Sequence, residues 1–394
     1  MIFDYISFVL NDIKTRKFSS FLTFFAIGLG ILSIYLIVLI STGFEQSIQN
    51  EFEKMGTNRI IIMPKNSNFA SLSKGLTDKD VNLIENRPYV KEVFPYYVKT
   101  LQLKHGNEYI TKMVLGSPMT KEHFESFGLD IVEGRYPRES DKYVAIVGPE
   151  IKDNFFSKRI SVGSSIEIKE RKFKVIGITK SLGNPEDDSN IYVDFNALRT
   201  LDDDSTNKNT IHMMYVTIQE NYDVKLAADN IKVFLENRLG KDKVEVQTLE
   251  EMLESFNTIL NIIKLTLGGI AFVSLIVGAL GIINTMFVII TEKTKDIGVM
   301  KAIGAKNKDI FSIYILQSGM FGLLGGIFGM IMGNFLAFMF ELWAQSAGFT
   351  FLEINTSITL MAYLLIFSFS IGAISGFIPS YRASKLKIVD TFRK

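Results

Sequence analysis

Few of the side chains that could carry out chemistry stand in arrangements that would support it. The three histidines, His105, His123 and His212, are scattered and lack the spacing of metal ligands, so we expect exposed or structural roles for them. Ser71 and Lys74 match the S-x-x-K pattern of some serine nucleophiles, but they lie in a polar stretch without partner motifs. We expect a solvated loop there, and the chain is predicted not to be an enzyme.

Nucleotide, metal and nucleic-acid chemistry find no better support. The chain has no G-x-x-x-x-G-K-[ST] phosphate loop, so ATP and its magnesium ion, if they drive this protein, bind another chain. The absence of cysteine excludes disulfides and thiolate metal sites. The acidic run 186–188 is expected to be a solvated turn, because the other ligands of a calcium loop are missing. With a net charge of +1 there is no reason to expect nucleic acid as a partner. We therefore predict no metal and no cofactor on this chain.

Four long apolar runs organise the chain instead. They are Phe18–Phe44, Leu265–Ile290, Ile310–Phe340 and Ile354–Ser380. Each reaches the roughly 20 residues that cross a hydrocarbon core about 30 Å thick, and buried helices of soluble proteins rarely run so long without a polar face. We predict four transmembrane helices. The first run is longer than the core of a signal peptide and no A-x-A site follows it, so it is expected to stay attached, preceded by an amphipathic helix in the membrane interface.

Basic residues in the short connections predict the orientation. Lys and Arg gather before the first span, between the second and third spans and in the tail, whereas Trp343–Glu353 carries neither. Helices that alternate in direction place these basic segments on one side, and basic loops stay cytoplasmic. We therefore expect a multi-pass protein of the cell membrane with both termini cytoplasmic. Residues 45–257, between the first and second spans, then lie outside the cytoplasm.

The segment 45–257 alternates strand and helix patterns, which predicts a large α+β domain. The pattern of residues 59–97 is similar to that of residues 213–247, so we expect both in one subdomain and residues 106–205 as a β-rich inserted subdomain. Hairpin turns are expected at residues 105–107 and 170–171. The predicted strands are 59–63, 98–103, 109–115, 143–147, 165–169, 172–180 and 213–219, and the predicted helices are 78–86, 121–127, 150–156, 195–201 and 223–239.

The whole layout is as follows: 1–17, interfacial helix; 18–44, 258–291, 310–341 and 354–380, transmembrane helices; 45–257, extracytoplasmic domain; 292–309, cytoplasmic coupling segment; 342–353, outer loop; 381–394, cytoplasmic tail.

The stretch Glu292–Gln317 is the most specific part of the sequence. Ile297, Val299–Met300 and Ile303 are expected on one apolar face of a helix too short to cross a bilayer. A short amphipathic helix between two spans suits a groove on a soluble partner. A plain connector resting on the membrane surface is the alternative.

This stretch, E-K-T-K-D-I-G-V-M-K-A-I-G-A, resembles the signature of the FtsX-like, MacB-type family of ABC transporter permeases. The resemblance covers nearly the whole chain and departs from the family at Gln317, where relatives often carry an acidic residue. The further segments that match, in the family's order, are Lys17–Thr23, Val114–Gly116, Val132–Arg135, Val144–Gly148, Phe173–Ile178, Ile191–Val193, Pro379–Leu386 and Val389–Asp390.

The resemblance implies a complex of two permease chains, as a homodimer or heterodimer, with cytoplasmic ABC ATPase subunits that bind ATP and magnesium. The residues 45–257 would be a MacB-like domain in two parts. The coupling helix that seats on the ATPase would consist of Thr294, Lys295, Asp296, Ile297, Gly298, Val299, Met300, Lys301, Ala302, Ile303 and Gly304.

Glycines four residues apart in the third and fourth spans predict close helix packing, because small residues let helix backbones approach. Glycine is also common in membrane helices generally, and the partner helix is not specified by the pattern. The glycines concerned are Gly322, Gly325, Gly326, Gly329, Gly333, Gly372 and Gly376.

Three classes of function remain. The first is a permease that transmits ATP-driven motion of a partner to the extracytoplasmic domain, for export or extraction of an amphiphilic cargo such as a peptide, lipid, lipoprotein or drug. The second is a transmembrane regulator that activates an extracytoplasmic enzyme such as a cell-wall hydrolase. The third, a membrane-anchored enzyme, is disfavoured by the missing catalytic residues.

Overall fold

The structure, a computed structural model, describes residues 17–65, 75–138, 140–202, 210–350, 352 and 354–388. It comprises two compact units. The helical unit contains Met1–Glu45, Ile259–Trp343 and Glu353–Lys394, and the sheet unit contains Gln46–Thr258 and Ala344–Leu352. The predicted interfacial helix and the Ser71–Lys74 motif lie outside the described residues.

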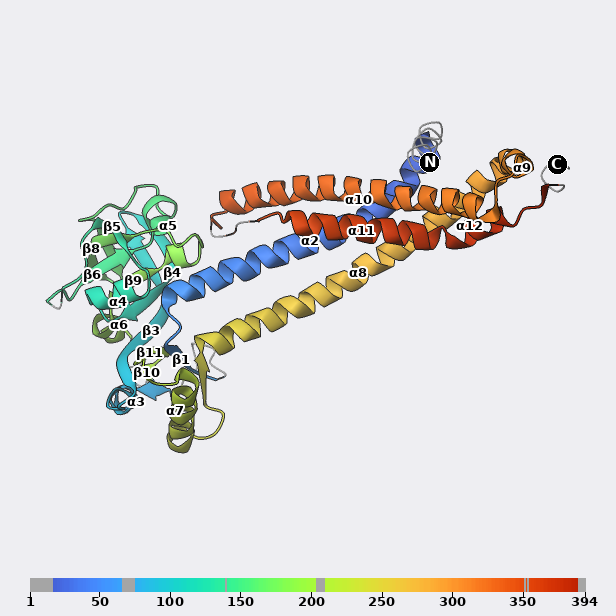
Figure 1. Ribbon diagram of the computed structural model, residues 1–394. Helices are drawn as coiled ribbons and strands as arrows, with labels where there is room; N and C mark the ends of the chain where they lie inside the picture. The colour runs from blue at the N-terminus through green and yellow to red at the C-terminus, as the bar shows by residue number, and fades with distance from the viewer. Residues whose placement is uncertain are drawn as a thin grey trace. The chain divides into compact units, whose positions relative to one another are not determined.

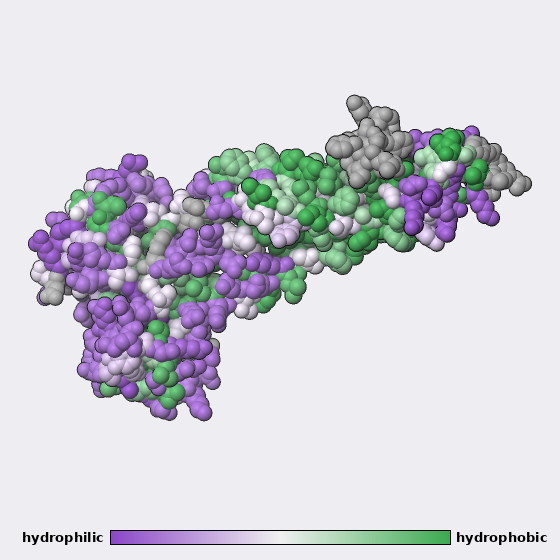
Figure 2. Space-filling view, viewed as in Figure 1, coloured by the Kyte–Doolittle hydropathy of each residue, from purple (hydrophilic) through white to green (hydrophobic). Residues whose placement is uncertain are grey.

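Long apolar helices form the helical unit (Figure 1). They are α2 (Lys17–Met55), α8 (Leu249–Glu292), α10 (Asn307–Ser346) and α11 (Ile358–Ser375), with the short helices α9 (Thr294–Ala302) and α12 (Phe377–Ser384) between and after them. Within the described residues, four helices are long and apolar enough to cross a membrane, as predicted. Figure 2 shows the apolar surface that they expose.

The fourth predicted span, 354–380, is two helices rather than one. The helix α11 ends at Ser375, and α12 begins two residues later, after Gly376. The prediction missed this division because the sequence stays uncharged across it, and hydropathy alone does not register a break between two helices.

A mixed sheet forms the sheet unit. Its strands run in the order β12-β1-β11-β3-β4-β9-β6-β8-β5, with β7 pairing β3 and β8, while β2 and β10 form a separate pair. The strands are β1 (Arg59–Pro64), β2 (Leu76–Thr77), β3 (Val90–His105), β4 (Glu108–Ser117), β5 (Ile131–Gly134), β6 (Val144–Val147), β7 (Ser165–Ile168), β8 (Arg171–Thr179), β9 (Ile191–Asp194), β10 (Thr210–Ile211), β11 (Met213–Ile218) and β12 (Val244–Thr248).

Short helices connect these strands, and each of the five predicted helices is present. They are α3 (Asp78–Glu85), α4 (Lys121–Ser126), α5 (Pro149–Asp153), α6 (Phe195–Thr200) and α7 (Val224–Leu239), with the 3-10 turn η1 (Asp187–Ser189) before β9. The seven predicted strands also fall on observed strands. The pattern did not assign β5 or β9, although β6 and β7, which have the same length, were predicted.

The long strand β3 pairs with strands on both sides of the predicted boundary at residue 106, where the inserted subdomain was expected to begin. Its first part pairs with β11 through Val90–Tyr96, and its second part, Tyr97–His105, pairs with β4. The sheet that contains β4 therefore includes residues before 106.

Both predicted hairpins are present. Gly106, at φ +62°, supplies the expected turn of the first hairpin. The second hairpin turns at Lys169–Glu170, both at positive φ, one residue earlier than predicted.

One face of the sheet packs on the main core of the unit, which includes Ile60, Tyr97, Phe173 and Val216.

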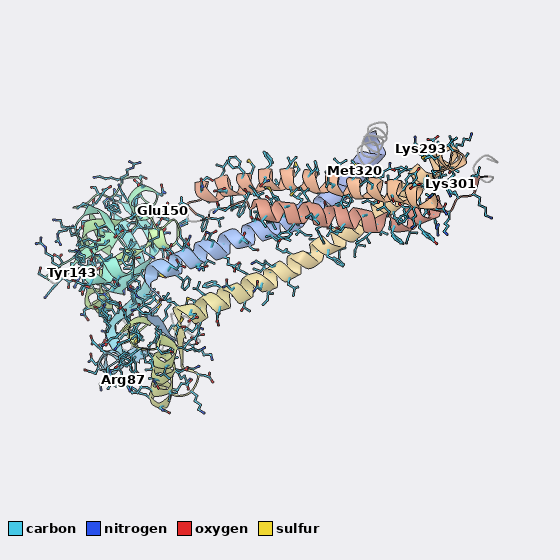
Figure 3. All side chains as sticks on the ribbon, in the orientation of Figure 1. Arg87, Tyr143, Glu150, Lys293, Lys301 and Met320 are labelled. Atoms are coloured by element: carbon cyan, nitrogen blue, oxygen red, sulfur yellow. The ribbon has the colours of Figure 1, made fainter. Side chains whose placement is uncertain are left out.

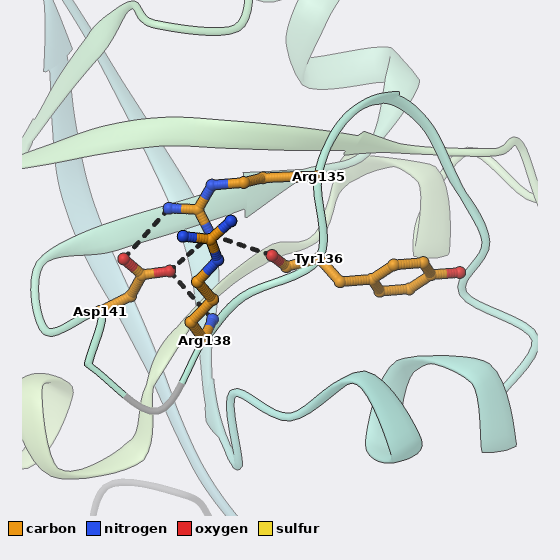
Figure 4. Close-up of polar contacts among 4 residues, drawn as sticks. All are labelled: Arg135, Tyr136, Arg138 and Asp141. Carbon is orange, nitrogen blue, oxygen red and sulfur yellow. Dashed lines mark hydrogen bonds and ion pairs between the residues drawn. The ribbon is translucent and has the colours of Figure 1, made fainter.

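An ion pair stabilises the loop that follows β5, the strand at the edge of the sheet (Figure 4). The Arg135 guanidinium donates two hydrogen bonds to the Asp141 carboxylate, at 2.7 and 3.1 Å, and the Arg138 backbone N–H donates a third at 2.9 Å. These bonds lower the pKa of Asp141 below its ordinary value.

Candidate coupling segment and helix seams

The short helix α9 is closed at its end by backbone hydrogen bonds. Gly304 lies at φ +107°, a conformation that favours glycine. Its N–H donates to the Lys301 carbonyl at 3.1 Å, and the Ala305 N–H donates to the Met300 carbonyl at 3.0 Å. This is the hydrogen-bond pattern of a Schellman motif, and Met300 and Ala305 both pack on the same apolar cluster. The chain can therefore reverse sharply into α10.

The inner face of α9 is part of the core of the helical unit. Ile297 is fully buried, in a cluster with Ile289, Ile310, Tyr314 and Ala383. The expectation that Ile297 lies on an outward docking face is therefore wrong. Burying this side chain holds α9 against the ends of α8, α10 and α12.

The outer face of α9 carries a different apolar set. Val299 and Ile303 are 49% and 82% exposed, and Lys295 and Ala302 are exposed beside them. Residues four apart stand on one face of a helix, so Lys295, Val299 and Ile303 form one surface. The exposed members of the predicted coupling set, and so the ones available to a partner, are Lys295, Asp296, Val299, Ala302, Ile303 and Gly304.

Lys301 joins α9 to the chain after α12. Its Nζ donates to the carbonyl oxygens of Ser384 and Leu386, both at 2.7 Å, and to Asn307 Oδ1 at 2.9 Å. The carbonyls at the end of a helix lack partners within it, and a Lys side chain satisfies them well. Desolvation and the nearby charge of Lys385 lower the pKa of Lys301. Figure 3 labels Lys301, together with Lys293, whose Nζ lies 3.1 Å from the Asp296 carboxylate.

Glycines of α10 and α11 form a tight seam. A Cβ atom on Gly322 would lie 2.1 Å from the Ser368 carbonyl oxygen, and one on Gly372 would lie 2.5 Å from the Ser318 carbonyl oxygen. The Ser368 hydroxyl donates to the Gly322 carbonyl at 2.9 Å. On the same seam, a Cβ on Gly326 would meet the Ser368 hydroxyl at 2.2 Å, and one on Gly376 would meet the Ser318 hydroxyl at 2.0 Å.

Other glycines of α10 face α2. A Cβ on Gly329 would lie 2.5 Å from the Gly28 carbonyl oxygen, and one on Gly333 would lie 2.5 Å from Tyr35 Cδ1. The Gly325 carbonyl oxygen lies 3.1 Å from the position of a Cβ on Gly28. The structure thus supplies the partner helices that the spacing of the glycines left open.

A third seam, which the glycine spacing did not predict, lies between α2 and α8. A Cβ on Gly30 would lie 2.7 Å from Leu275 Cδ2, and one on Gly278 would lie 3.0 Å from Ile27 Cα. These glycines come from two different helices, so no four-residue spacing marks them. Glu45 and Lys264 also link these two helices, with an ion pair at 2.9 Å.

Two of the histidines, His123 and His212, are buried among aromatic side chains and have structural roles. His123 is buried, and its Nε2 lies 2.5 Å from the Tyr96 hydroxyl, while desolvation lowers its pKa to about 3. His212 stacks on Tyr97 and accepts the Val98 N–H, and desolvation lowers its pKa to about 4. Both are neutral at pH 7. In the described part of the chain, no group of three metal-ligating side chains comes together.

The acidic run is the predicted solvated turn only in part, because Glu186 and Asp187 are exposed whereas Asp188 is not. Asp188 is buried, and its carboxylate accepts the Leu182 N–H at 2.7 Å and the Ser181 hydroxyl at 2.5 Å. Its role is to satisfy the backbone of a loop.

Comparison with known proteins matches both units. Residues 20–233 match the family described as MacB-like periplasmic core domain, and residues 268–388 match the FtsX-like permease C-terminal family. An uncharacterized ABC transporter permease of Methanocaldococcus jannaschii is 33% identical over 392 residues, covering 99% of this chain and 98% of that protein. The macrolide export ATP-binding/permease protein MacB of Shewanella sp. (strain W3-18-1) is 27% identical, covering 98% of this chain and 60% of that protein.

A solved structure, the periplasmic region of MacB from Actinobacillus actinomycetemcomitans, matches with a TM-score of 0.44 and 20% identity, covering 53% of this chain and 97% of that one.

The apolar helices and the matched domains define the class of this protein as a multi-pass membrane permease with a MacB-like periplasmic core domain. The chain belongs to the FtsX-like, MacB-type family of ABC transporter permeases. It spans about 60% of the length of the MacB relative from Shewanella.

Proposed function

We propose that this chain is the permease subunit of an ABC transport complex, and that it transmits ATP-driven motion from a cytoplasmic ATPase to an extracytoplasmic domain. The cargo would be an amphiphile that is exported or extracted, and both termini would be cytoplasmic. The MacB relatives are named as both ATP-binding and permease proteins. This chain has no phosphate-loop motif, so ATP and magnesium would be bound by a separate ATPase subunit.

The observation that carries the proposal is the two-sided construction of α9. Its inner side is fixed by the buried Ile297 and by the three hydrogen bonds of Lys301. Its outer side presents Val299 and Ile303 to whatever covers it. A helix that is rigidly held on one side and apolar on the other can receive a force without being displaced from its own chain.

The motion received by α9 would be transmitted to the sheet unit along uninterrupted helices. The helix α8 contributes residues to both units, as does α2, without a break in either element. A displacement at the α9 end of α8 would therefore pass along hydrogen-bonded backbone rather than through a flexible linker. The glycine seams would make the neighbouring helices move with it. We propose this as the route by which ATP hydrolysis moves the sheet unit.

The test uses the exposed face of α9. The ATPase is first identified as the protein with a phosphate-loop motif that co-purifies with this chain from its native membrane. The permease with Ile303→Asp is then reconstituted in lipid nanodiscs with that ATPase. Losing the burial of one large apolar side chain costs about 2 kcal/mol, which corresponds to roughly 30-fold weaker docking. We expect stimulation of ATP hydrolysis to need correspondingly more ATPase.

The matched control is Leu226→Asp, which makes the same kind of change at an exposed side chain of α7 in the sheet unit. It should leave the ATPase stimulation unchanged. If Ile303→Asp also stimulates hydrolysis like the unaltered permease, α9 does not couple to the ATPase and the proposal fails.

A further inference from the structure

A groove lies on the outer surface of the helical unit, at the end of α8. It is lined by Phe287, Val288, Thr291 and Glu292, and its volume is about 310 Å³. The first two of these residues belong to the last turn of the predicted span Leu265–Ile290, and the other two follow that span. The groove therefore extends across the end of the apolar segment, where the hydrocarbon core of a bilayer is followed by lipid headgroups.

The helix α12 lies beside this groove (Figure 1). Its Ala383 is fully buried in one apolar cluster with Met286 and Ile289 of α8. Its Arg382 guanidinium lies 5.3 Å from the centre of the Phe287 ring, which is itself part of the groove. This cation–π contact positions the guanidinium without using it in an ion pair.

The charge beside the groove is positive. Arg382, Lys385 and Lys387 are all exposed, and none of them pairs with a carboxylate among the residues that the structure describes. Desolvation and the Lys385 charge lower the pKa of Lys301, which is a further sign of uncompensated positive charge. Glu292 is the one carboxylate in the groove lining, and it already has a partner. An anion is therefore the complementary ligand.

The exposed side chains of α12 change from apolar to basic along the helix. Phe377, Ile378 and Tyr381 are each more than half exposed, and Arg382 and Lys385 follow them. A helix that leaves a bilayer meets hydrocarbon first, then the interface that aromatic side chains prefer, and then the headgroups that attract basic side chains. Because α12 follows this order, we place its two cations at the level of the headgroups.

The groove and the cations together suit a molecule that carries a hydrocarbon chain and an anionic group. A free phosphate ion would use Arg382 but not the apolar wall formed by Phe287 and Val288. A guanidinium matches the oxygens of a phosphate group in pairs, which favours phosphate as the anionic group. A headgroup that also carries a cation, such as choline, would be repelled by Lys385 and Lys387.

We propose that this groove is a binding site for an anionic phospholipid, with the headgroup phosphate on the Arg382 guanidinium and an acyl chain along Phe287 and Val288. The proposal goes beyond the coupling function and does not depend on it, since lipid binding requires neither ATP nor the ATPase.

The test titrates the full chain in detergent micelles, without any ATPase, with single phospholipids. Native mass spectrometry resolves the chain with no lipid, one lipid or more, and so gives an equilibrium constant for each step. The probes are phosphatidylglycerol and phosphatidylcholine with the same acyl chains. We expect the first phosphatidylglycerol to bind about 10-fold more tightly than the first phosphatidylcholine, because each basic side chain at the headgroup level strengthens the binding of an anionic lipid several-fold.

Variants locate the site. Arg382→Gln should lower the affinity for phosphatidylglycerol about 5-fold, whereas Arg382→Lys, which keeps the charge, should retain most of it. The matched control is Lys308→Gln, which removes the same charge from an exposed position at the beginning of α10 and should bind as the unaltered chain does. Glycerol 3-phosphate, a headgroup phosphate without acyl chains, should not displace phosphatidylglycerol even in about 100-fold excess, because it gains nothing from the apolar wall.

Equal affinity for the two phospholipids in the unaltered chain would overturn the proposal. An equal loss in Arg382→Gln and Lys308→Gln would also overturn it, since general attraction to a basic surface would then explain the binding. Displacement by glycerol 3-phosphate would show a site for the phosphate alone and would overturn the assignment to a lipid.

Discussion

The substitution Gly322→Ala adds a single methyl group to the seam between α10 and α11. The new Cβ would lie 2.1 Å from the Ser368 carbonyl oxygen, whereas ordinary contacts begin at 3.4 Å. The neighbouring atom is helix backbone, which cannot turn aside as a flexible side chain does. The helices must therefore separate, which also stretches the hydrogen bond from the Ser368 hydroxyl to the Gly322 carbonyl.

The expected cost follows from these two losses. Overpacking a tightly packed interior costs typically 1–3 kcal/mol, and an interhelical hydrogen bond in a membrane contributes about 0.6 kcal/mol. We expect Gly322→Ala to lower the free energy of unfolding by about 2 kcal/mol, or roughly 30-fold in the equilibrium constant. Unfolding by sodium dodecyl sulfate in bicelles, followed by circular dichroism, measures this change.

Gly281→Ala is the matched control, because a Cβ at Gly281 of α8 meets nothing within 4 Å. Alanine has the higher helix propensity, so this variant should be as stable as the unaltered chain or slightly more so. Gly326→Ala supplies a second comparison, since its Cβ would meet the Ser368 side chain and not backbone. Adding Ser368→Gly should relieve Gly326→Ala and leave Gly322→Ala unrelieved. Equal unfolding free energies for Gly322→Ala and Gly281→Ala would refute the close-packed seam.

Two further perturbations test single side chains. Lys301→Met removes three hydrogen bonds made by a charged group. We therefore expect the amide hydrogens of α9 to exchange at least about 10-fold faster in a hydrogen-exchange measurement. Lys295→Met, an exposed change on the same helix, is the control and should leave the exchange rate unchanged. Asp141→Asn weakens a partly exposed ion pair, so we expect the sheet unit to lose about 1 kcal/mol at pH 7. Because folding lowers the pKa of Asp141, this difference is present above the ordinary pKa of 3.8 and vanishes as the pH falls through the folded value; a difference that persists at low pH would contradict the assignment.

The spans and most elements of the sheet unit could be predicted because each rests on a local property, either apolar length or strict alternation. Which side of α9 is buried could not be predicted in that way. Ile297 and Ile303 are six residues apart, about 240° around a helix, so they cannot share a face. Val299 and Ile303 are four apart and do. Because α9 is apolar on both sides, only the surrounding helices decide which side is buried, and those contacts come from parts of the chain that are distant in sequence.

The glycines of α10 show how one local pattern serves two partners. Gly322, Gly326, Gly329 and Gly333 lie within about 60° of one another around the helix, so they form a single stripe. The structure fills the first half of this stripe with α11 and the second half with α2. A helix held along one stripe by two different partners cannot separate from one of them by rotation without disturbing its contact with the other.

This arrangement has a consequence for the proposed coupling. The helix α2 packs closely against α10 and also against α8, where Gly30 and Gly278 lie. The helix α8 is followed directly by α9. Each seam has backbone or a packed side chain within van der Waals distance, so the four helices resist sliding independently. A force received by α9 is then expected to displace them together, which distinguishes this permease from one that opens a path between its own helices.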